Sequence, residues 1–425
     1  MFVRSSMLVP LAEPAPSRLP RFDHLTFRGN LKETRYGWLR LTPAYSVHLV
    51  AELLDGAWSA GDVVLDPFCG TGTTALVCAE RGIACDTTDI NPFLLWLARA
   101  KSTPYAPGHV DAFRAQAARV GKAMRGEGTL AWTPSLHQIE KWWDPPALHA
   151  LARAMRAIRR HERDVPREVT DLLLLAFCRV MIDRAHVSFG HQSMSFRKKA
   201  ASEVPEAEAA VSAWDRAVEG IGAAAGSLIA TPASPIHCDA RDLRKALPSS
   251  RYGVVITSPP YPNRMSYIRE LRPYMYWLGY LSDGRQAGEL DWKAIGGTWG
   301  CATSNVSKWK PASPVTVPYE GFEDIVRKIR AKSDVLGPYV AKYFHDMTAH
   351  CASLAAVVAP AGTVHYIVGN SKFYDVMLPV ERIYAAMFEA AGFVDARVRT
   401  IRKRTSKKEL FEFVVSARKP KKGKR

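Results

Sequence analysis

A buried strand that breaks into a glycine turn constrains this chain more than any other stretch. Residues 63–66 are apolar up to the carboxylate of Asp66, Gly70 and Gly72 follow, and an apolar helical period begins at Thr73. The two glycines allow a tight turn and a close approach of the backbone to a ligand. The order of strand, glycine turn and helix predicts an α/β fold with a cofactor at the turn.

A second strand with an acidic end follows the first helix. It runs over residues 83–89 and ends at Asp89, after which Asn91 and Pro92 open another apolar helix. An acid in this position is placed to accept hydrogen bonds from ribose hydroxyls. The glycine turn lacks both the third glycine of the dinucleotide fingerprint and the Lys-Ser/Thr pair of a phosphate-binding loop. A nucleoside cofactor without a pyrophosphate is therefore favoured.

The charge balance and the cysteines limit the possible partners. The chain has 425 residues, and 58 Lys and Arg against 41 Asp and Glu give a formal charge of +17. This excess favours a polyanionic partner, with nucleic acid first. The seven cysteines show no C-x-x-C pair, so neither a zinc site nor a disulfide framework is indicated. Because no signal pattern or long apolar run is present, we expect a cytoplasmic protein without a metal or a membrane span.

Strands and helices alternate along the chain except in one long segment. A proline-rich segment over 1–21 is expected to be flexible, and a first α/β part spans 22–104. Amphipathic helical periods with no convincing strand fill 105–235, which predicts an inserted helical module. The α/β pattern returns over 236–418 and closes with strands at 396–399 and 410–417, and a basic tail covers 419–425.

A polar, basic and aromatic stretch over 183–199 separates two helices of the insert. Its Arg and Lys side chains can neutralise phosphates, and Gln192 can reach base edges. We therefore predict a nucleic-acid contact loop, with a solvated surface loop as the alternative. The two histidines of the stretch lack the further ligands that a metal site needs. The basic residues of this prediction are Arg184, Arg197, Lys198 and Lys199.

A second motif lies beyond the insert, where an apolar strand over 252–256 runs into Thr257-Ser258-Pro259-Pro260-Tyr261. The two prolines end the strand and stiffen a turn at its carboxyl end, where carbonyl oxygens face the crevice. Oxygen acceptors in this position can hold an exocyclic amine and draw its lone pair toward an electrophile. The tyrosine can stack on a base that has left the helix.

Together these motifs resemble those of the amino-group DNA methyltransferases. The glycine turn reads D-P-F-C-G-T-G-T-T over 66–74, Asn91-Pro92 follows Asp89, and T-S-P-P-Y spans 257–261. The resemblance covers roughly residues 36–102 and 236–418. It implies a Rossmann-like class I methyltransferase sheet, here with an inserted helical module, S-adenosylmethionine as cofactor and double-stranded DNA as partner.

The resemblance also implies where the cofactor lies. Asp89 is expected to accept from the ribose, Asp239 to lie beside the adenine ring, and an element just before the first strand to pack over the methionine end. The implied cofactor-binding residues are Tyr45, Ser46, Asp66, Pro67, Phe68, Gly70, Thr71, Gly72, Thr73, Thr74, Asp89, Ile90, Asn91, Asp239 and Ala240.

Ser258, Pro259, Pro260 and Tyr261 are similar to the catalytic motif that methylates the exocyclic amine of a flipped base. A serine in the first position is more similar to the cytosine-N4 branch, since adenine-N6 enzymes more often carry Asn or Asp. Many S-P-P-Y enzymes place this motif before the cofactor loop, whereas it comes after the loop here, so adenine-N6 stays an alternative. A carbon-5 enzyme is disfavoured because its cysteine nucleophile is replaced by Pro260.

Two further classes are an RNA amino-methyltransferase and a catalytically silent nucleic-acid-binding protein. No RNA-binding domain is recognisable in the first 35 residues or in the insert, and the motifs are intact.

Arg264 and Tyr267 follow the catalytic turn closely enough to contact the substrate strand. The Gly-, Ser- and Trp-rich segment 282–318 lacks periodicity and is predicted to form a loop that substrate orders. The residues do not indicate a restriction endonuclease counterpart.

Overall fold

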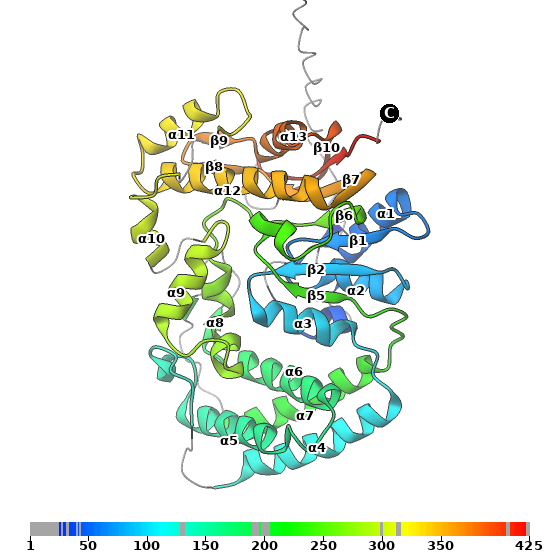
Figure 1. The fold of residues 1–425 in the computed structure, drawn as a ribbon. Coiled ribbons are helices and arrows are strands. Elements are labelled where there is room, and N and C mark those ends of the chain that lie inside the picture. Colours follow the sequence, from blue (N-terminus) through cyan, green and yellow to red (C-terminus); the bar gives the residue numbers. More distant parts are fainter. Residues whose placement is uncertain are drawn as a thin grey trace, which may run out of the picture.

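The computed structural model describes residues 25–26, 29–30, 34–39, 41, 44–127, 132–188, 195–196, 205–297, 301–311, 316–404 and 409–421. Within them, seven strands form one sheet in the order β10-β11-β7-β6-β1-β2-β5 (Figure 1). Their bounds are β1 Val63–Asp66, β2 Cys85–Asp89, β5 Ser234–His237, β6 Tyr252–Thr257, β7 Val358–Gly369, β10 Val394–Lys403 and β11 Phe411–Arg418.

The direction of the strands confirms the predicted Rossmann-like sheet. β1 pairs in parallel with β2 on one side and with β6 on the other, and β5 and β7 continue the parallel sheet outward. β11 pairs antiparallel with both β7 and β10, which closes the sheet as expected. Because the strand order reverses between β1 and β6, a crevice for ligands opens there at the carboxyl ends.

Helices cover both faces of the sheet. Val64 packs in the same apolar cluster as Leu49 of α1 (Val47–Ala57), whereas its neighbour Leu65 packs in the cluster of α12 (Leu336–Val357). Successive strand residues point to opposite faces, so α1 and α12 lie on different sides. α2 (Thr73–Glu80) shares the cluster of α1, and α13 (Val380–Ala390) shares that of α12.

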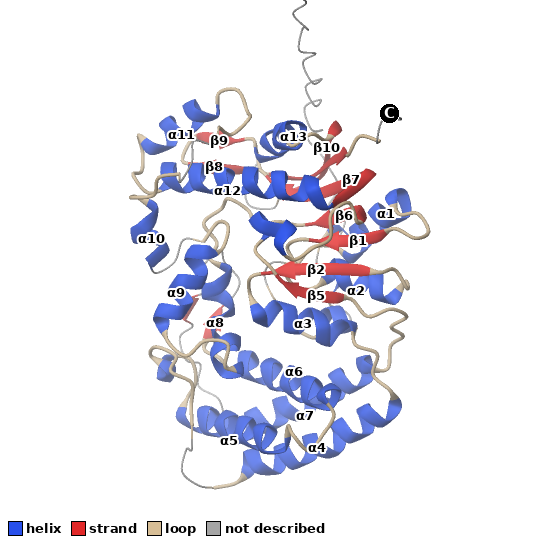
Figure 2. Cartoon of the chain, in the orientation of Figure 1, coloured by secondary structure: helices blue, strands red, loops and turns tan. Residues whose placement is uncertain are grey.

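The segment expected to be a helical insert contains four long helices, which lie apart from the sheet at the bottom of Figure 1 and are plainly helical in Figure 2. They are α4 Pro107–Arg125, α5 Pro145–His161, α6 Arg167–Asp183 and α7 Glu206–Ala225. Their apolar faces form one cluster with α3 (Pro92–Ser102) and α8 (Tyr267–Leu278). The insert also holds a short antiparallel pair that the sequence did not predict, β3 (Val187–Ser188) and β4 (Ser195–Phe196).

The segment 282–318 is not the irregular loop that its composition predicts. It contains α9 (Gly284–Lys293) and α10 (Cys301–Val306). α9 begins where the Asp283 side chain accepts from the Gln286 amide, at 2.9 Å. Arg285 and Glu289 pair one turn apart on the same helix, at 2.8 Å. A cap and an i,i+4 ion pair thus stabilise a helix that tryptophan and glycine content obscured.

Shorter elements complete the fold. Among them, α11 (Phe322–Arg330) packs against α12, and β8 (Ser371–Phe373) pairs with β9 (Val376–Leu378). The short helices are η3 Arg35–Gly37, η4 Ile139–Lys141 and η5 Ala240–Lys245. In the part of the chain described, no helix has both the length and the apolar character needed to span a bilayer.

Candidate active site

A cavity of about 290 Å³ lies at the carboxyl ends of β1, β2 and β6, where the strand order reverses. It brings together residues that the sequence placed in two separate motifs. The lining residues predicted to bind cofactor are Tyr45, Pro67, Phe68, Gly70, Asp89, Ile90, Asn91, Asp239 and Ala240. Ser258, Pro259, Pro260, Tyr261 and Tyr267 line the same cavity. One cavity therefore joins the glycine turn to the S-P-P-Y turn.

The glycine turn needs its glycines for two reasons. Gly70 and Gly72 have φ of +51° and +75°, in the left-handed region that favours glycine. A Cβ on Gly72 would also lie 3.1 Å from both the Cα and the Cβ of Ala98. The turn therefore packs closely against α3, and Gly70 faces the cavity.

Asp66 does not line the cavity but supports residues around it. Its fully buried carboxylate accepts from Thr257 Oγ1 at 2.6 Å, from the Phe68 amide at 3.2 Å and from the Tyr45 hydroxyl at 3.1 Å. Burial raises the pKa of this carboxyl to about 7, although these hydrogen bonds oppose the shift. Asp66 therefore ties β1, β6 and the segment before α1 into one frame.

Other residues predicted to bind cofactor also lie outside the lining. Thr74 Oγ1 donates to the Ile256 carbonyl at 3.2 Å, and Ser46 caps α1 by accepting from the Leu49 amide. These contacts join the glycine turn to β6 and fix the start of α1. The predicted residues that do not line the cavity are Ser46, Asp66, Thr71, Gly72, Thr73 and Thr74.

Asp89 is presented to the cavity by two backbone amides. Its carboxylate accepts from the Asn91 amide at 2.8 Å and from the Gly70 amide at 3.4 Å. Burial raises the pKa of the carboxyl to about 6, against the effect of these amides. Asn91 in turn caps α3 by accepting from the Phe93 amide at 3.0 Å. The glycine turn, the acid and the open cavity fit a ribose-bearing cofactor.

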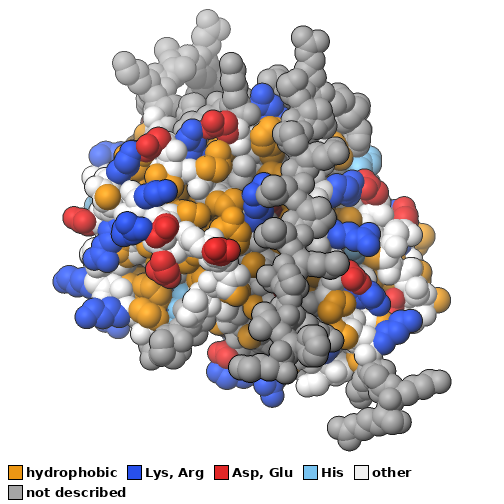
Figure 3. Space-filling model, turned by 90° about the horizontal axis from the view of Figure 1, so that it is seen from above, with side chains coloured by type: hydrophobic (Ala, Val, Ile, Leu, Met, Phe, Trp, Pro, Cys, Tyr) orange, Lys and Arg blue, Asp and Glu red, His pale blue; other side chains and the backbone are white. Residues whose placement is uncertain are grey.

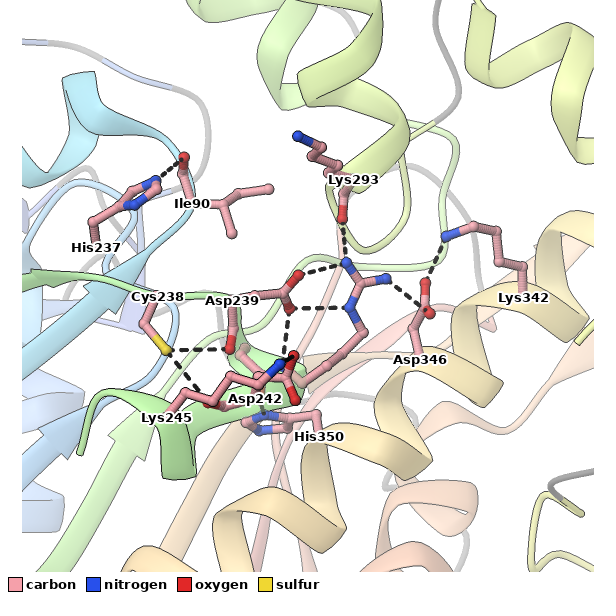
Figure 4. A network of polar contacts seen from close by, with 12 residues as sticks. Ile90, His237, Cys238, Asp239, Asp242, Lys245, Lys293, Lys342, Asp346 and His350 are labelled. Atoms are coloured by element: carbon pink, nitrogen blue, oxygen red, sulfur yellow. Dashed lines mark hydrogen bonds and ion pairs between the residues drawn. The ribbon is translucent and has the colours of Figure 1, made fainter. Parts of the chain in front are cut away.

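Asp239 is part of an ion-pair network at the edge of the cavity, which Figure 4 shows from close by. Arg241 donates from Nε to Asp239 Oδ1 at 3.0 Å and from Nη2 to Oδ2 at 2.6 Å. It also reaches Asp346 at 3.0 Å and the Lys293 carbonyl at 2.8 Å. Burial acts to raise the pKa of Asp239, but the bonds and charge of Arg241 outweigh it and hold that pKa below its usual value. A cofactor donor would share this carboxylate with Arg241.

His350 supports the same wall, and sequence reasoning missed it. Its Nδ1 lies 2.7 Å from the Ala240 carbonyl, and its Nε2 lies 2.6 Å from the Tyr366 hydroxyl. The ring packs edge-on against Phe68, with centroids 4.9 Å apart. Burial lowers the pKa of this imidazole to about 4, so it is neutral at physiological pH. A histidine inside a long apolar helix carried no sequence signal for this position.

The S-P-P-Y turn begins where β6 ends. Ser258 Oγ donates to the Ile367 carbonyl at 3.1 Å, and the Pro260 carbonyl accepts from the Tyr343 hydroxyl at 2.7 Å. The Pro259 carbonyl has no hydrogen-bond donor among the described residues. The Tyr261 amide donates to the Tyr267 hydroxyl at 3.4 Å. Three hydrogen bonds thus fix the turn. The Ser258 oxygen keeps lone pairs that can accept a hydrogen bond from a ligand.

The closing strands add three lining residues that sequence reasoning did not find, Arg402, Arg404 and Glu412. The Tyr261 hydroxyl donates to Glu412 Oε1 at 3.0 Å, and Arg402 Nε donates to Oε2 of the same carboxylate at 2.7 Å. The guanidinium carbon of Arg404 lies 5.7 Å from the centre of the Tyr261 ring. These strands are far from the motif in sequence, so only the fold brings the groups together.

The residues predicted to contact DNA are scattered. Tyr267 lines the cavity, whereas Arg264 does not, and the amide of Arg264 donates to the Tyr339 hydroxyl at 3.2 Å. Arg184 pairs with Glu206 at 2.7 Å and is only 22% exposed. The other predicted contacts lie outside the described residues: Gln192, Arg197, Lys198 and Lys199.

Neither a metal nor a cysteine nucleophile has support in the described residues. No group of three or more His, Cys, Asp or Glu side chains is placed there to hold a metal ion. Cys69, in the glycine turn, is buried, and burial raises the pKa of its thiol well above the ordinary value. A buried thiol with a raised pKa is a poor nucleophile.

Comparison with known proteins bears on the cofactor end of the cavity. Residues 41–100 match the model of a DNA methylase family. This chain is also similar, over 69 residues, to the Type II methyltransferases M.AvaI of Nostoc and M.BsoBI of Geobacillus stearothermophilus, with 32% and 35% identity. M.MjaII of Methanocaldococcus jannaschii is 40% identical over 57 residues. These matches show that a short part of this chain is similar to DNA methyltransferases.

The matches are short. Those to M.AvaI and M.BsoBI cover 16% of this chain and 14% of each relative, and that to M.MjaII covers 13% and 11%. Among solved structures, the rRNA methyltransferase aviRa of Streptomyces viridochromogenes has 14% identity and a TM-score of 0.28, over 89% of this chain and 87% of its own. A SAM-dependent methyltransferase of Methanosarcina mazei has 10% identity and a TM-score of 0.31, over 90% and 100%. Scores this low carry no argument about function.

Proposed function

We propose that this chain is a DNA methyltransferase that transfers a methyl group from S-adenosylmethionine to the exocyclic N4 amine of cytosine in duplex DNA. The observation that carries the proposal is the single cavity lined by both the Asp89 end and the Ser258–Tyr261 turn. A cofactor at one end and a flipped base at the other would meet inside it. Adenine-N6 is the second candidate, because the same acceptors suit its amine.

Asp89 is the residue best placed to recognise the cofactor. Its carboxylate is oriented by the Gly70 and Asn91 amides and faces the cavity. A ribose would donate its hydroxyls to this carboxylate, and Phe68 and Ile90 give apolar surface beside it. When bound, S-adenosylmethionine supplies an electrophilic methyl group.

Two oxygens of the S-P-P-Y turn would hold the amine of the base. The Ser258 hydroxyl donates its single hydrogen to the Ile367 carbonyl at 3.1 Å, with the Tyr261 hydroxyl as a more distant acceptor at 3.4 Å. The lone pairs of the Ser258 oxygen are therefore left to act as acceptors. The Pro259 carbonyl is the second acceptor. An amine that donates both hydrogens turns its lone pair toward the opposite side, and the stiff turn keeps nitrogen aligned with the methyl carbon.

No general base is assigned to the reaction. The nitrogen becomes more acidic as it is methylated, so its proton can leave after the attack. Glu412 is a lining carboxylate in contact with the turn, but Arg402 and the Tyr261 hydroxyl occupy its oxygens. This carboxylate therefore orients Tyr261, which would stack on the ring of the flipped base.

The test is incubation of the full chain with labelled S-adenosylmethionine and unmethylated duplex DNA, followed by digestion and nucleoside analysis. N4-methylcytosine is the expected product. N6-methyladenine would select the second candidate, and preferential labelling of RNA would favour an RNA enzyme. A cofactor-binding protein that labels neither would be a silent nucleic-acid-binding protein.

Ser258→Ala tests the catalytic turn. We expect turnover to fall by about tenfold or more, since one hydrogen bond to the reacting amine is lost, while cofactor affinity stays near wild type. Ser249→Ala, at an exposed serine before β6, is the matched control. Equal turnover of Ser258→Ala and wild type would contradict the assigned role.

Tyr261→Ala tests the base pocket. We expect weaker productive binding of DNA, because a base that leaves the stack at a cost of a few kcal/mol loses its aromatic partner. Tyr374→Ala, at a tyrosine that is 57% exposed, controls for the loss of an aromatic ring. If Tyr261→Ala folds, binds cofactor and methylates at the wild-type rate, the pocket is wrong.

A further inference from the structure

Arg404 lies directly after β10, beside Tyr261 in the cavity. Besides the contact with the Tyr261 ring, its Nη1 donates to the Asn370 carbonyl at 3.2 Å. Gly369 makes this approach possible, because a Cβ there would lie 3.0 Å from both Arg404 Nη1 and the Tyr261 ring. The guanidinium is therefore fixed in the cavity by two contacts.

Within the described residues, the positive charge of Arg404 has no carboxylate partner, whereas that of Arg402 has one. Arg402 pairs with Glu412 at 2.7 Å, whereas no carboxylate in the described residues forms an ion pair with Arg404. A guanidinium carries five N–H donors in one plane, and the Asn370 carbonyl takes one of them. The remaining donors are available to a ligand in the cavity.

Cytosine and adenine differ in the acceptor atoms that lie beside the exocyclic amine. Cytosine carries N3 and then O2, which are two adjacent acceptors, next to the N4 amine. Adenine carries N1 next to the N6 amine, and a C–H follows. A planar guanidinium fork matches two adjacent acceptors and makes a charge-assisted pair of hydrogen bonds with them.

We propose that Arg404 is a specificity-determining residue that donates to N3 and O2 of the flipped cytosine while Ser258 and Pro259 hold its N4 amine. The proposal rests on the cytosine-N4 function proposed above and gives it a physical reason. An adenine in the same place would satisfy only one of the two donors. The unmatched donor would then face the C–H of adenine without an acceptor, which disfavours adenine.

The experiment measures how the enzyme responds to loss of one base acceptor. Duplexes carry the methylated sequence of the wild-type enzyme, mapped first on natural DNA, with either cytosine or 3-deazacytosine at the target. The analogue keeps the amine and O2 but has a C–H in place of N3. Single-turnover rates on both duplexes give a ratio for wild type, Arg404→Gln and Arg404→Lys.

We expect the ratio of the rate on cytosine to the rate on 3-deazacytosine to be at least about tenfold larger for wild type than for Arg404→Gln. On the analogue, wild type loses a charge-assisted hydrogen bond to N3, which Arg404→Gln cannot form. Arg404→Lys, which keeps the charge without the fork, should also have a reduced ratio. Arg399→Gln is the matched control on β10, the strand that leads to Arg404, since Arg399 pairs with Glu52 at 2.9 Å outside the cavity. Its ratio should equal that of wild type.

Equal ratios for wild type and both Arg404 variants would overturn the proposal, even where N4-methylcytosine is the product and the proposed function stands. This result would also be expected if Arg404 held a phosphate instead of a base edge. N6-methyladenine as the wild-type product on natural DNA would instead overturn the proposed cytosine function, together with the role of Arg404. The wild-type measurements do not depend on the folding of any variant.

Discussion

Asp89 allows the cofactor end of the cavity to be tested by binding alone. Asp89→Ala removes the acceptor that the Gly70 and Asn91 amides orient. Each hydrogen bond to a charged group contributes about 1.5–3 kcal/mol, so affinity for S-adenosylmethionine should fall more than tenfold. Calorimetry with the apoprotein measures this directly. Unchanged affinity would remove Asp89 from the site.

The pH dependence at Asp89 has a definite sign. Burial raises the pKa of this carboxyl to about 6, so it becomes protonated as the pH falls through 6. Its capacity to accept from hydroxyls then declines, and cofactor affinity should fall between pH 7 and 5. Asp89→Asn should lose affinity at pH 7 and show a flatter profile. A wild-type affinity that is constant over this range would contradict the assignment.

The raised pKa values of buried carboxyls also affect the stability of the apoprotein, which they lower as the pH rises. The pKa values of Asp66 and Asp89 are raised to about 7 and 6, so folding favours their protonated forms. Their stabilising contribution is complete below the unfolded pKa near 3.8 and is lost as the pH rises through 6 to 7. Replacing both by Asn should therefore reduce the gain in apoprotein stability that lowering the pH from 7 to 5 provides. Urea unfolding at the two pH values measures that difference.

At the scale of elements, Arg35 joins the helical insert to the sheet. Its buried guanidinium donates to the Lys101 carbonyl at 2.9 Å, just before the insert begins, and to the Ser227 carbonyl at 2.9 Å, just after α7. It also lies 5.4 and 5.1 Å from the ring centres of Trp38 and Tyr105. One side chain thus fixes both points where the chain crosses between the two parts.

Arg35→Lys should lower the free energy of unfolding by at least about 3 kcal/mol, because a lysine cannot satisfy both sets of carbonyls at once. Arg81→Lys is the control, since the Arg81–Asp55 pair is exposed and its change should cost less than about 1 kcal/mol. Urea unfolding measures both. A loss for Arg35→Lys no larger than that for Arg81→Lys would show that the contacts do not hold the insert.

Sequence reasoning succeeded for elements whose signals are local. The glycine turn, the acid-ended strand β2 and the turn after β6 each lie in a short continuous stretch, and the structure brings them to one cavity. β10 was predicted only over 396–399 but spans Val394–Lys403, because its partly exposed, arginine-rich residues conceal the strand alternation. Hydrophobic periodicity reports burial, so an exposed edge strand gives a weak signal.

The supporting side chains of the site could not have been found in this way. Arg404 and Glu412 line the cavity from the end of β10 and from β11, and His350 of α12 supports its wall through the Ala240 carbonyl. Their roles depend on packing between distant segments. Such partners follow from the tertiary fold and not from spacing along the chain.

At the scale of the whole molecule, the formal charge of +17 does not make every face uniformly basic. The face in Figure 3, seen from above Figure 1, mixes basic and acidic side chains. Some exposed cations of the chain are matched by acids, as in the pairs of Lys332 with Asp375 and of Arg418 with Asp395. A phosphate backbone would have to displace these acids, so these cations are poor candidates for contacts with DNA.

We therefore expect duplex DNA to be held by other surfaces, including the insert, with an affinity that depends steeply on salt. If about six phosphates are neutralised, a plot of log K against log salt has a slope near −5. A fluorescence titration at several salt concentrations measures it. A flat response, or stronger competition by folded RNA than by duplex DNA, would contradict the proposed partner.

The insert can be tested apart from the catalytic cavity. Arg156 and Arg160 are exposed on α5 and have no hydrogen-bond or ion-pair partner among the described residues. Replacing both by Gln should lower the magnitude of the salt slope by about two and weaken binding of all sequences alike, because phosphate contacts carry no sequence information. The control replaces Arg327 and Lys332, which pair with Asp324 and Asp375, and should leave the slope unchanged. If the two double variants change the slope equally, the insert has no special part in holding DNA, and its four helices serve the stability of the fold.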